Sequence, residues 1–163
     1  MPDNKGLFET LHSDYHAMVL QMCIGFMKGD RDLAKDLSQL VFINTWQAMN
    51  KFNNASSYKT WIYRITVNTC LKYIRDKKDK YQVSIDEAPI HLADESGQPS
   101  DKKHLSLYQA IGQLAEVDRL IIMMVLDELD YEEISNIIGI NEGNLRVKIH
   151  RIKKNLKTIL ENE

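Results

Sequence analysis

The C-terminal part of the sequence contains a segment whose side chains have the types and spacing needed to bind nucleic acid. Between Asn144 and Thr158 there are six Lys or Arg residues and no Asp or Glu. Leu145, Ile149 and Ile152 recur at the spacing of one helix face, so a helix here would pack that face and leave its cations elsewhere. Such a helix can hold DNA phosphates, although a basic amphipathic helix can also be only the solvated face of a small bundle.

The residues before this basic segment predict a short helix and a tight turn. Asp130 followed by Glu133 has the spacing of a capping box, and Gly139 can end a helix in the left-handed conformation. Asn141 can then cap the next helix. This order is typical of a helix-turn-helix motif, whose second helix enters the DNA major groove, and it favours DNA binding over a solvated face. We expect contacts to base edges from Glu142, Asn144, Arg146 and Val147, and contacts to phosphates from Lys148, Arg151 and Lys154.

A second candidate site lies in the first half of the chain, where aromatic and basic residues alternate. Aromatic rings can stack on unpaired bases while cations hold the backbone, so this combination suits single-stranded nucleic acid. Aromatic residues of a small domain are more often buried, and we interpret Trp46 and Trp61 as mainly structural. The pattern does not decide whether Tyr63 stacks on a base or packs in the core. The residues concerned are Phe52, Tyr58, Trp61 and Tyr63, with Lys51, Lys59 and Arg64 among them.

No group of residues has the spacing of a catalytic or metal site. His12 and His16 share a helix face, but no acid, glycine-rich phosphate loop or third ligand accompanies them. Cys23 and Cys70 stand singly and form neither a disulfide framework nor a zinc-ligand spacing, so we interpret both as reduced core residues. We therefore predict a protein that is not an enzyme and that has no catalytic residues, no metal and no cofactor.

Basic and acidic residues are distributed unevenly along the chain. The sequence has 21 basic and 23 acidic residues, a net charge of −2, which argues against coating nucleic acid through bulk positive charge. Residues 59–80, however, carry seven cations and two acids, a net +5, and residues 144–158 carry +6. Such a chain should bind duplex DNA weakly alone and better when a partner protein holds both basic segments. Its short apolar runs and the lack of a secretory signal predict a cytoplasmic protein.

Apolar periodicity predicts an all-α fold of two small helical domains joined by a flexible linker. Helices are expected over residues 6–28, 30–50 and 58–75, which gives an N-terminal three-helix domain at 1–76. Residues 77–102 contain Pro89 and Pro99 without sustained periodicity and are predicted to be the linker. The C-terminal domain, at 103–163, contains the helix-turn-helix. The second helix has an apolar stripe expected to face the core, made of Leu33, Leu37, Val41 and Ala48. Asp36, Gln39 and Ile43 lie on the opposite side, which is suited to a partner.

Three stretches of the sequence together resemble the extracytoplasmic-function sigma factors of the sigma-70 family. They are AKDLSQLVFINTW, KFNNASSYKTWIYRITVNTCLKYIR and, after the linker, YEEISNIIGINEGNLRVKIHRIKKNL. The resemblance covers nearly the whole chain. It implies a factor that directs bacterial core RNA polymerase to promoters and assists promoter melting, with a region 2-like N-terminal domain for the minus-ten element and a region 4-like C-terminal domain for the minus-thirty-five element.

The same resemblance implies roles for individual residues. The second helix would bind the clamp helices of the largest polymerase subunit through Asp36, Gln39, Leu40 and Ile43. The loop at 52–57 would capture a flipped base with Phe52, Asn53, Asn54 and Ser56, and the third helix would contact the melted strand with Tyr58, Lys59, Tyr63, Arg64 and Asn68. Asn68 could instead bridge helices internally. The acids of the linker, at 86–101, could imitate a nucleic-acid backbone or simply be solvated. The flap of the second-largest subunit is a further expected partner.

The sequence departs from the family pattern at a few positions. Ala115 stands where a proline is frequent, and Leu129 stands where a glycine is frequent. Asn144 and Val147 are less usual in the recognition helix, so the family's promoter preferences cannot be transferred.

Two other classes of protein remain open. One is a stand-alone helix-turn-helix regulator, which usually needs a dimer. The other is a helical protein-binding adaptor, which would not need the aromatic and basic residues around Lys59. We expect a monomer when free. Many members of the family are held inactive by an anti-sigma factor, and nothing in this chain identifies one.

Overall fold

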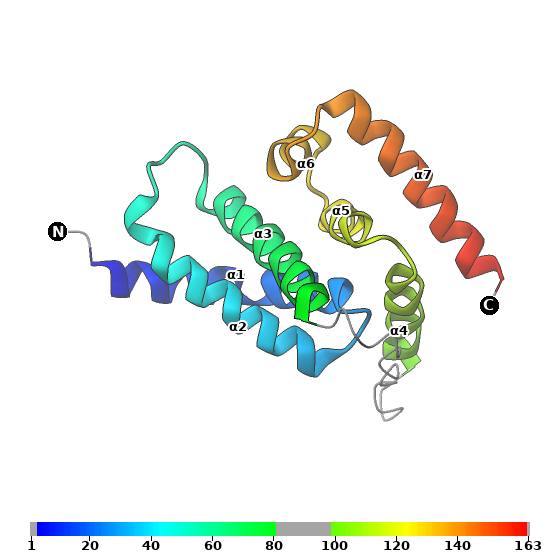
Figure 1. Cartoon of the computed structure of the whole chain (residues 1–163), viewed down its shortest axis with the longest axis horizontal. Helices are drawn as coiled ribbons and strands as arrows, with labels where there is room; N and C mark the ends of the chain where they lie inside the picture. The colour runs from blue at the N-terminus through cyan, green and yellow to red at the C-terminus, as the bar shows by residue number, and fades with distance from the viewer. Residues whose placement is uncertain (1–2, 81–98, 163) are drawn as a thin grey trace.

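The computed structural model describes residues 3–80 and 99–162, with the backbone alone at 80 and 99–104. Every regular element within these residues is a helix, which confirms the all-α prediction (Figure 1). None of the described helices is long and apolar enough to cross a membrane. The elements are α1 (Asn4–Phe26), α2 (Arg31–Ala48), the short 3-10 helix η1 (Met49–Lys51), α3 (Tyr58–Lys80), α4 (Pro99–Gly112), α5 (Glu116–Leu126), α6 (Tyr131–Ile138) and α7 (Glu142–Glu161).

Helices α1, α2 and α3 pack against one another as the predicted three-helix unit. The Asp30 carboxylate accepts a hydrogen bond from the Leu33 amide at 3.1 Å, so it caps α2 as predicted. Leu37 and Val41 from the predicted α2 stripe are buried, which places that stripe in the core. Between α1 and α2 the chain reverses through Gly29, whose φ of +88° is in the left-handed region.

The C-terminal helices form the predicted helix-turn-helix. The Asp130 carboxylate accepts a hydrogen bond from the Glu133 amide at 2.8 Å and so begins α6. Gly139, at φ +86°, ends that helix, and the Asn141 side chain accepts from the Asn144 amide at 2.7 Å to begin α7. The helix starts predicted at Asp130 and Asn141 and the glycine turn predicted at Gly139 are confirmed.

The helices on either side of the predicted linker are longer than expected. Helix α3 continues past Arg75 to Lys80, and α4 already begins at Pro99, inside the predicted linker at 77–102. Proline is well tolerated in the first turn of a helix, where its missing N–H has no partner to lose, so Pro99 begins a helix. Residues 81–98, which hold most of the linker acids, lie outside the described residues.

The two helical halves share one continuous hydrophobic core. Helix α5 contacts α1 and α3 on one side and α7 on the other, and Figure 1 shows it between α3 and α7. A Cβ atom added to Gly25 would lie 2.3 Å from Met123 Sδ, so the missing side chain at residue 25 leaves room for the Met123 side chain between α1 and α5.

Candidate nucleic-acid interface

One side of α7 is buried and the opposite side is exposed, as its sequence predicts. Leu145, Ile149 and Ile152 are each no more than 2% exposed, whereas Val147 is 51% exposed. The exposed side carries most of the predicted DNA contacts, namely Asn144, Arg146, Val147, Arg151 and Lys154. His150 is also exposed on this side and is not among the residues predicted to contact DNA. Its position between Val147 and Arg151 in the sequence is the signal that could have placed it on the exposed side of the helix.

Arg146 is held in place by two contacts. Its Nη2 donates to Glu142 Oε1 at 2.8 Å, and its guanidinium carbon lies 5.1 Å from the centre of the Tyr131 ring. The side chain still keeps 62% of its surface exposed. An arginine fixed in this way loses less rotamer freedom when it forms a bidentate contact with a base edge. Glu142 therefore helps to orient Arg146.

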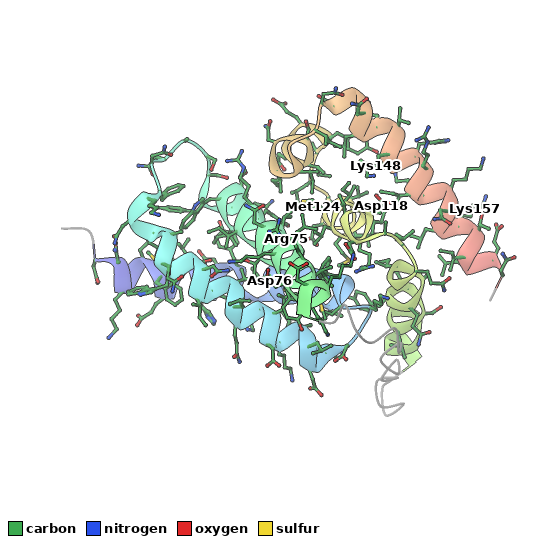
Figure 2. All side chains as sticks on the ribbon, viewed as in Figure 1. Arg75, Asp76, Asp118, Met124, Lys148 and Lys157 are labelled. Atoms are coloured by element: carbon green, nitrogen blue, oxygen red, sulfur yellow. The ribbon has the colours of Figure 1, made fainter. Side chains whose placement is uncertain are left out.

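Lys148 lies toward α5. Its ammonium is 3.0 Å from Asp118 Oδ1, and this oxygen is buried (Figure 2). The contact ties α7 to α5 across the C-terminal half. The structure therefore separates Lys148 from Arg151 and Lys154, which have exposed side chains.

The loop between η1 and α3 is shaped by its own side chains. Asn53 Oδ1 accepts from the Ala55 amide at 3.1 Å, and Asn54 has a φ of +60°, a left-handed conformation that asparagine tolerates. The Phe52 ring stacks on Tyr58 with centroids 4.7 Å apart and lies 4.8 Å from Trp61. The predicted loop residues thus sit beside an aromatic cluster, with Asn53 and Asn54 exposed and Ser56 half-buried.

The predicted residues of α3 do not share one environment. Lys59 and Asn68 are exposed and Arg64 is half-buried, whereas Tyr63 is only 2% exposed. The Tyr63 hydroxyl donates to Asp127 Oδ2 at 2.8 Å, and Asp127 belongs to the C-terminal half. Burial and this hydrogen bond raise the pKa of Tyr63, so the phenol remains protonated. Tyr63 cannot reach DNA in this arrangement of the halves, whereas Asn68 is exposed to solvent.

The predicted partner face of α2 is exposed and partly apolar. Asp36 and Gln39 are exposed, Leu40 is 37% exposed and Ile43 is 53% exposed. Trp46 extends the same face with 47% of its surface exposed, although its ring also packs edge-on against Phe8 at 5.3 Å. Contiguous exposed apolar side chains usually mark an interaction surface. The contact with Phe8 fits the structural role predicted for Trp46, but its exposure was not predicted, although a residue three positions after Ile43 lies on this face.

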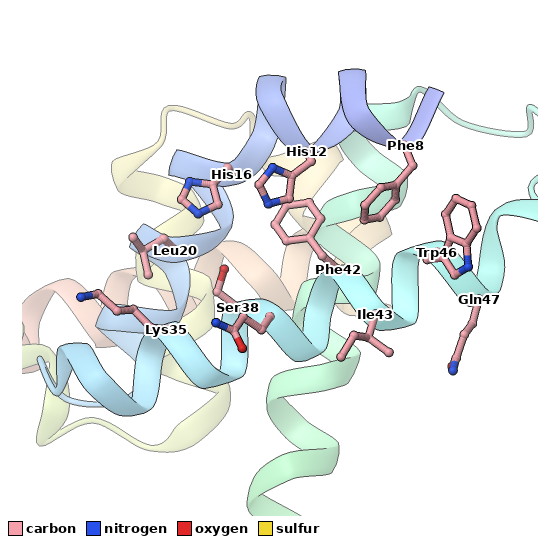
Figure 3. A pocket seen from close by; sticks show the side chains of 11 residues that line it. Phe8, His12, His16, Leu20, Lys35, Ser38, Phe42, Ile43, Trp46 and Gln47 are labelled. Atoms are coloured by element: carbon pink, nitrogen blue, oxygen red, sulfur yellow. The ribbon is translucent and has the colours of Figure 1, made fainter. Parts of the chain in front are cut away.

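A groove of about 690 Å³ runs beside this face between α1 and α2 (Figure 3). The His12 and His16 rings lie next to each other in it, 4.9 Å apart, and His12 packs against Phe42 at 4.6 Å. Within residues 3–80 and 99–162, no group of three or more His, Cys, Asp or Glu side chains is placed to hold a metal ion. The two histidines take part in aromatic packing.

Comparison with known proteins gives matches over most of the chain. The family model described as Sigma-70 region 2 matches residues 7–80, and the model described as Sigma-70, region 4 matches residues 104–156. The RNA polymerase sigma factor YlaC of Bacillus subtilis is 30% identical over 77% of this chain and 76% of its own length. The ECF RNA polymerase sigma factor SigW of the same organism is 28% identical over 92% of this chain and 87% of its own length. Among solved structures, the sigma factor RpoE of Bartonella quintana, in complex with the anti-sigma factor NepR, has a TM-score of 0.76 at 21% identity and covers 94% of this chain and 96% of its own.

Proposed function

Because the chain belongs to the extracytoplasmic-function group of the sigma-70 family, whose members direct RNA polymerase to promoters, we propose how its surfaces divide that task. Helix α2 binds core polymerase, α7 recognises the upstream promoter element, and the loop at 52–57 with α3 captures the minus-ten element. No bond is made or broken, so the chain acts by binding and not by catalysis. Core RNA polymerase and promoter DNA are its partners, which places its action in the cytoplasm of a bacterium.

The exposed apolar side chains of α2 are the observation that carries this proposal. Leu40, Ile43 and Trp46 expose between 37% and 53% of their surface on one helix face. Asp36 and Gln39 surround them with polar groups that can set the orientation of a partner. We assign this face to the clamp helices of the largest polymerase subunit. The C-terminal half would meet the flap of the second-largest subunit, and an anti-sigma factor is a further candidate partner.

Melting of the minus-ten element would be driven by binding energy. Extruding a base costs a few kcal/mol of stacking and pairing. Stacking on an aromatic ring returns about 1–3 kcal/mol per base, and the Phe52 and Tyr58 rings are already paired beside the loop. The exposed amides of Asn53 and Asn54 can add hydrogen bonds to the edge of the flipped base.

Co-elution with bacterial core RNA polymerase in gel filtration tests the assignment of α2 without knowledge of the promoter. The wild-type chain should co-elute stoichiometrically, and the double variant Asp36→Arg, Gln39→Ala should be lost from the complex. Asp14→Arg is the matched control, because it makes the same change of charge on an exposed α1 residue outside this face. Failure of the wild-type chain to bind its cognate core would refute the proposed function. Equal loss in both variants would refute the assignment of α2.

A further inference from the structure

Two imidazole side chains lie next to each other in the groove between α1 and α2. His12 and His16 are four residues apart on α1, so their side chains leave the helix on the same face. Figure 3 shows both rings extending from α1 toward α2, where the Phe42 ring packs against them. The same four-residue spacing places the two zinc-binding histidines of the H-E-x-x-H motif on one helix face. The pair therefore has the spacing of two ligands for one metal ion.

The separation of the two rings also fits a shared metal ion. Their centroids are 4.9 Å apart, and their planes are tilted by 37°. Two imidazoles that bind one ion through nitrogens at about 2.0–2.1 Å have centroids roughly 4.5–5.2 Å apart, for bond angles between square-planar and tetrahedral. His12 and His16 therefore need only rotate their rings to direct one nitrogen each at the same point, without movement of α1.

The packing around the pair orients the rings and leaves their nitrogens available. Both histidines are exposed, and among the described residues neither imidazole has a hydrogen-bond or ion-pair partner. Phe42 is 5% exposed and forms a fixed wall, with its centroid 4.6 Å from that of His12 and 6.3 Å from that of His16. Lys35 also lines the groove, but it is exposed, so its long side chain can keep the ammonium in water and away from an ion.

The chain supplies two ligands and leaves the other coordination positions of the ion open. In the part of the chain that the structure describes, no third His, Cys, Asp or Glu side chain is placed with the pair to hold a metal. Water can fill the open positions, as it does in zinc sites that are not closed by protein ligands. Gln39 and Ile43 line this groove and also belong to the α2 face, so an ion here lies beside any protein that binds that face.

We propose that His12 and His16 form a two-imidazole binding site for a divalent transition metal ion, of the Zn²⁺, Cu²⁺ and Ni²⁺ class that prefers imidazole nitrogen. The site goes beyond the proposed binding of polymerase and does not depend on it. A divalent ion bound here adds positive charge at the edge of the α2 face, whose exposed side chains Leu40, Ile43 and Trp46 are apolar. Occupancy therefore changes the electrostatic potential that a partner of this face meets.

Calorimetric titration of the free chain with Zn²⁺ alone, without a histidine-containing tag, tests the site. The wild-type chain should bind one ion at its tightest site. His16→Gln leaves a single imidazole, and because two linked ligands bind much more tightly than one, the affinity should fall about 100-fold. His150→Gln is the matched control, because it removes another exposed histidine, on α7, and should leave the affinity unchanged. Wild-type binding that is no tighter than that of His16→Gln would overturn the proposal.

A shifted pair of histidines tests whether their spacing, and not the histidine content, makes the site. The double variant His16→Gln, Ala17→His keeps two histidines at exposed positions of α1 but places them five residues apart, on different faces. It should lose the tight binding as His16→Gln does, and circular dichroism distinguishes this from a loss of helix. Tight Zn²⁺ binding by the shifted pair would contradict the proposal.

The number of bound imidazoles can be counted with Cu²⁺, which nitrogen sites bind more tightly than Zn²⁺. Electron paramagnetic resonance of the wild-type chain with one equivalent of Cu²⁺ should show splitting by two nitrogen nuclei. His12→Gln and His16→Gln should each show splitting by one. A wild-type spectrum with a single nitrogen, or one that neither substitution changes, would rule out a shared ion between the two rings.

Discussion

The ammonium of Lys148 lies 3.0 Å from Asp118 Oδ1, which joins the recognition helix α7 to α5. The surrounding cations of α7 are exposed, whereas the Lys148 side chain is 41% exposed and that of Asp118 is 23% exposed. The same type of residue therefore has two different uses on one helix. Lys148 pairs with α5 inside the C-terminal half, and its exposed neighbours remain available for phosphates.

Substitution of Lys148 should reduce stability more than it reduces DNA binding. Lys148→Ala leaves the buried Asp118 oxygen without its cation, and because both side chains are partly exposed we expect a loss of about 1 kcal/mol in the free energy of unfolding. Lys154→Ala should leave the free energy of unfolding unchanged. It should remove about one phosphate contact, and so reduce the slope of the logarithm of the duplex-binding constant against the logarithm of the salt concentration by about 1. Urea unfolding and a salt titration measure the two effects. The structural role of Lys148 is wrong if both variants lower the salt dependence of DNA binding equally and neither changes the free energy of unfolding.

Replacement of Arg119 should be costly, and lysine should not restore the loss. The guanidinium donates to the carbonyls of Phe26 and Leu114 through two different nitrogens, at 3.0 and 2.8 Å. Arg119→Ala leaves both buried carbonyls without this donor, and we expect a loss of about 2–4 kcal/mol in the free energy of unfolding. A lysine ammonium cannot reproduce the planar fork, so Arg119→Lys should recover less than half of that loss. Urea unfolding of the two variants is the measurement, and full recovery by lysine would contradict the role of the fork.

Protonation of Asp127 should stabilise the folded chain. Burial raises the pKa of Asp127, although the Tyr63 hydrogen bond and the Lys59 cation act in the opposite direction. A carboxyl group whose pKa is higher in the folded than in the unfolded chain binds its proton more tightly when folded. Its contribution to stability therefore falls as the pH rises from about 4, the unfolded pKa, through the raised value. Asp127→Asn, whose amide oxygen can still accept from Tyr63, should remove this fall.

The difference between the wild-type chain and Asp127→Asn in urea unfolding, measured from pH 4 to 8, isolates this residue from the other acids. We expect the variant to gain stability relative to the wild-type chain as the pH rises. Parallel profiles for wild type and Asp127→Asn would show that burial does not shift this carboxyl group.

Local sequence rules were sufficient to predict the helices. The environments of several candidate site residues instead depend on contacts with residues far away in the sequence. The caps at Asp30, Asp130 and Asn141 depend on residues within one helical turn, so their spacing was sufficient. The positions of Tyr63 and Lys148 depend on acids 64 and 30 residues away, and no local pattern contains that information. Helix α5 is buried from Arg119 to Met124, and no local pattern predicted that α1 and α3 would cover it.

The variant Asn54→Gly should test the hydrogen-bonding role of the 52–57 loop without changing its backbone conformation. Asn54 has a φ of +60° and an exposed amide, so Asn54→Gly keeps the left-handed backbone while it removes the hydrogen-bonding group. If that amide holds a flipped base, the variant should bind core polymerase normally but melt promoters about tenfold less well, the cost of one hydrogen bond. Promoters selected from random duplexes by the wild-type holoenzyme, with 2-aminopurine in the minus-ten element, provide the fluorescence readout. Ala55→Gly, at the exposed neighbour, controls for added loop flexibility, and wild-type melting by Asn54→Gly would rule out a role for this amide in base capture.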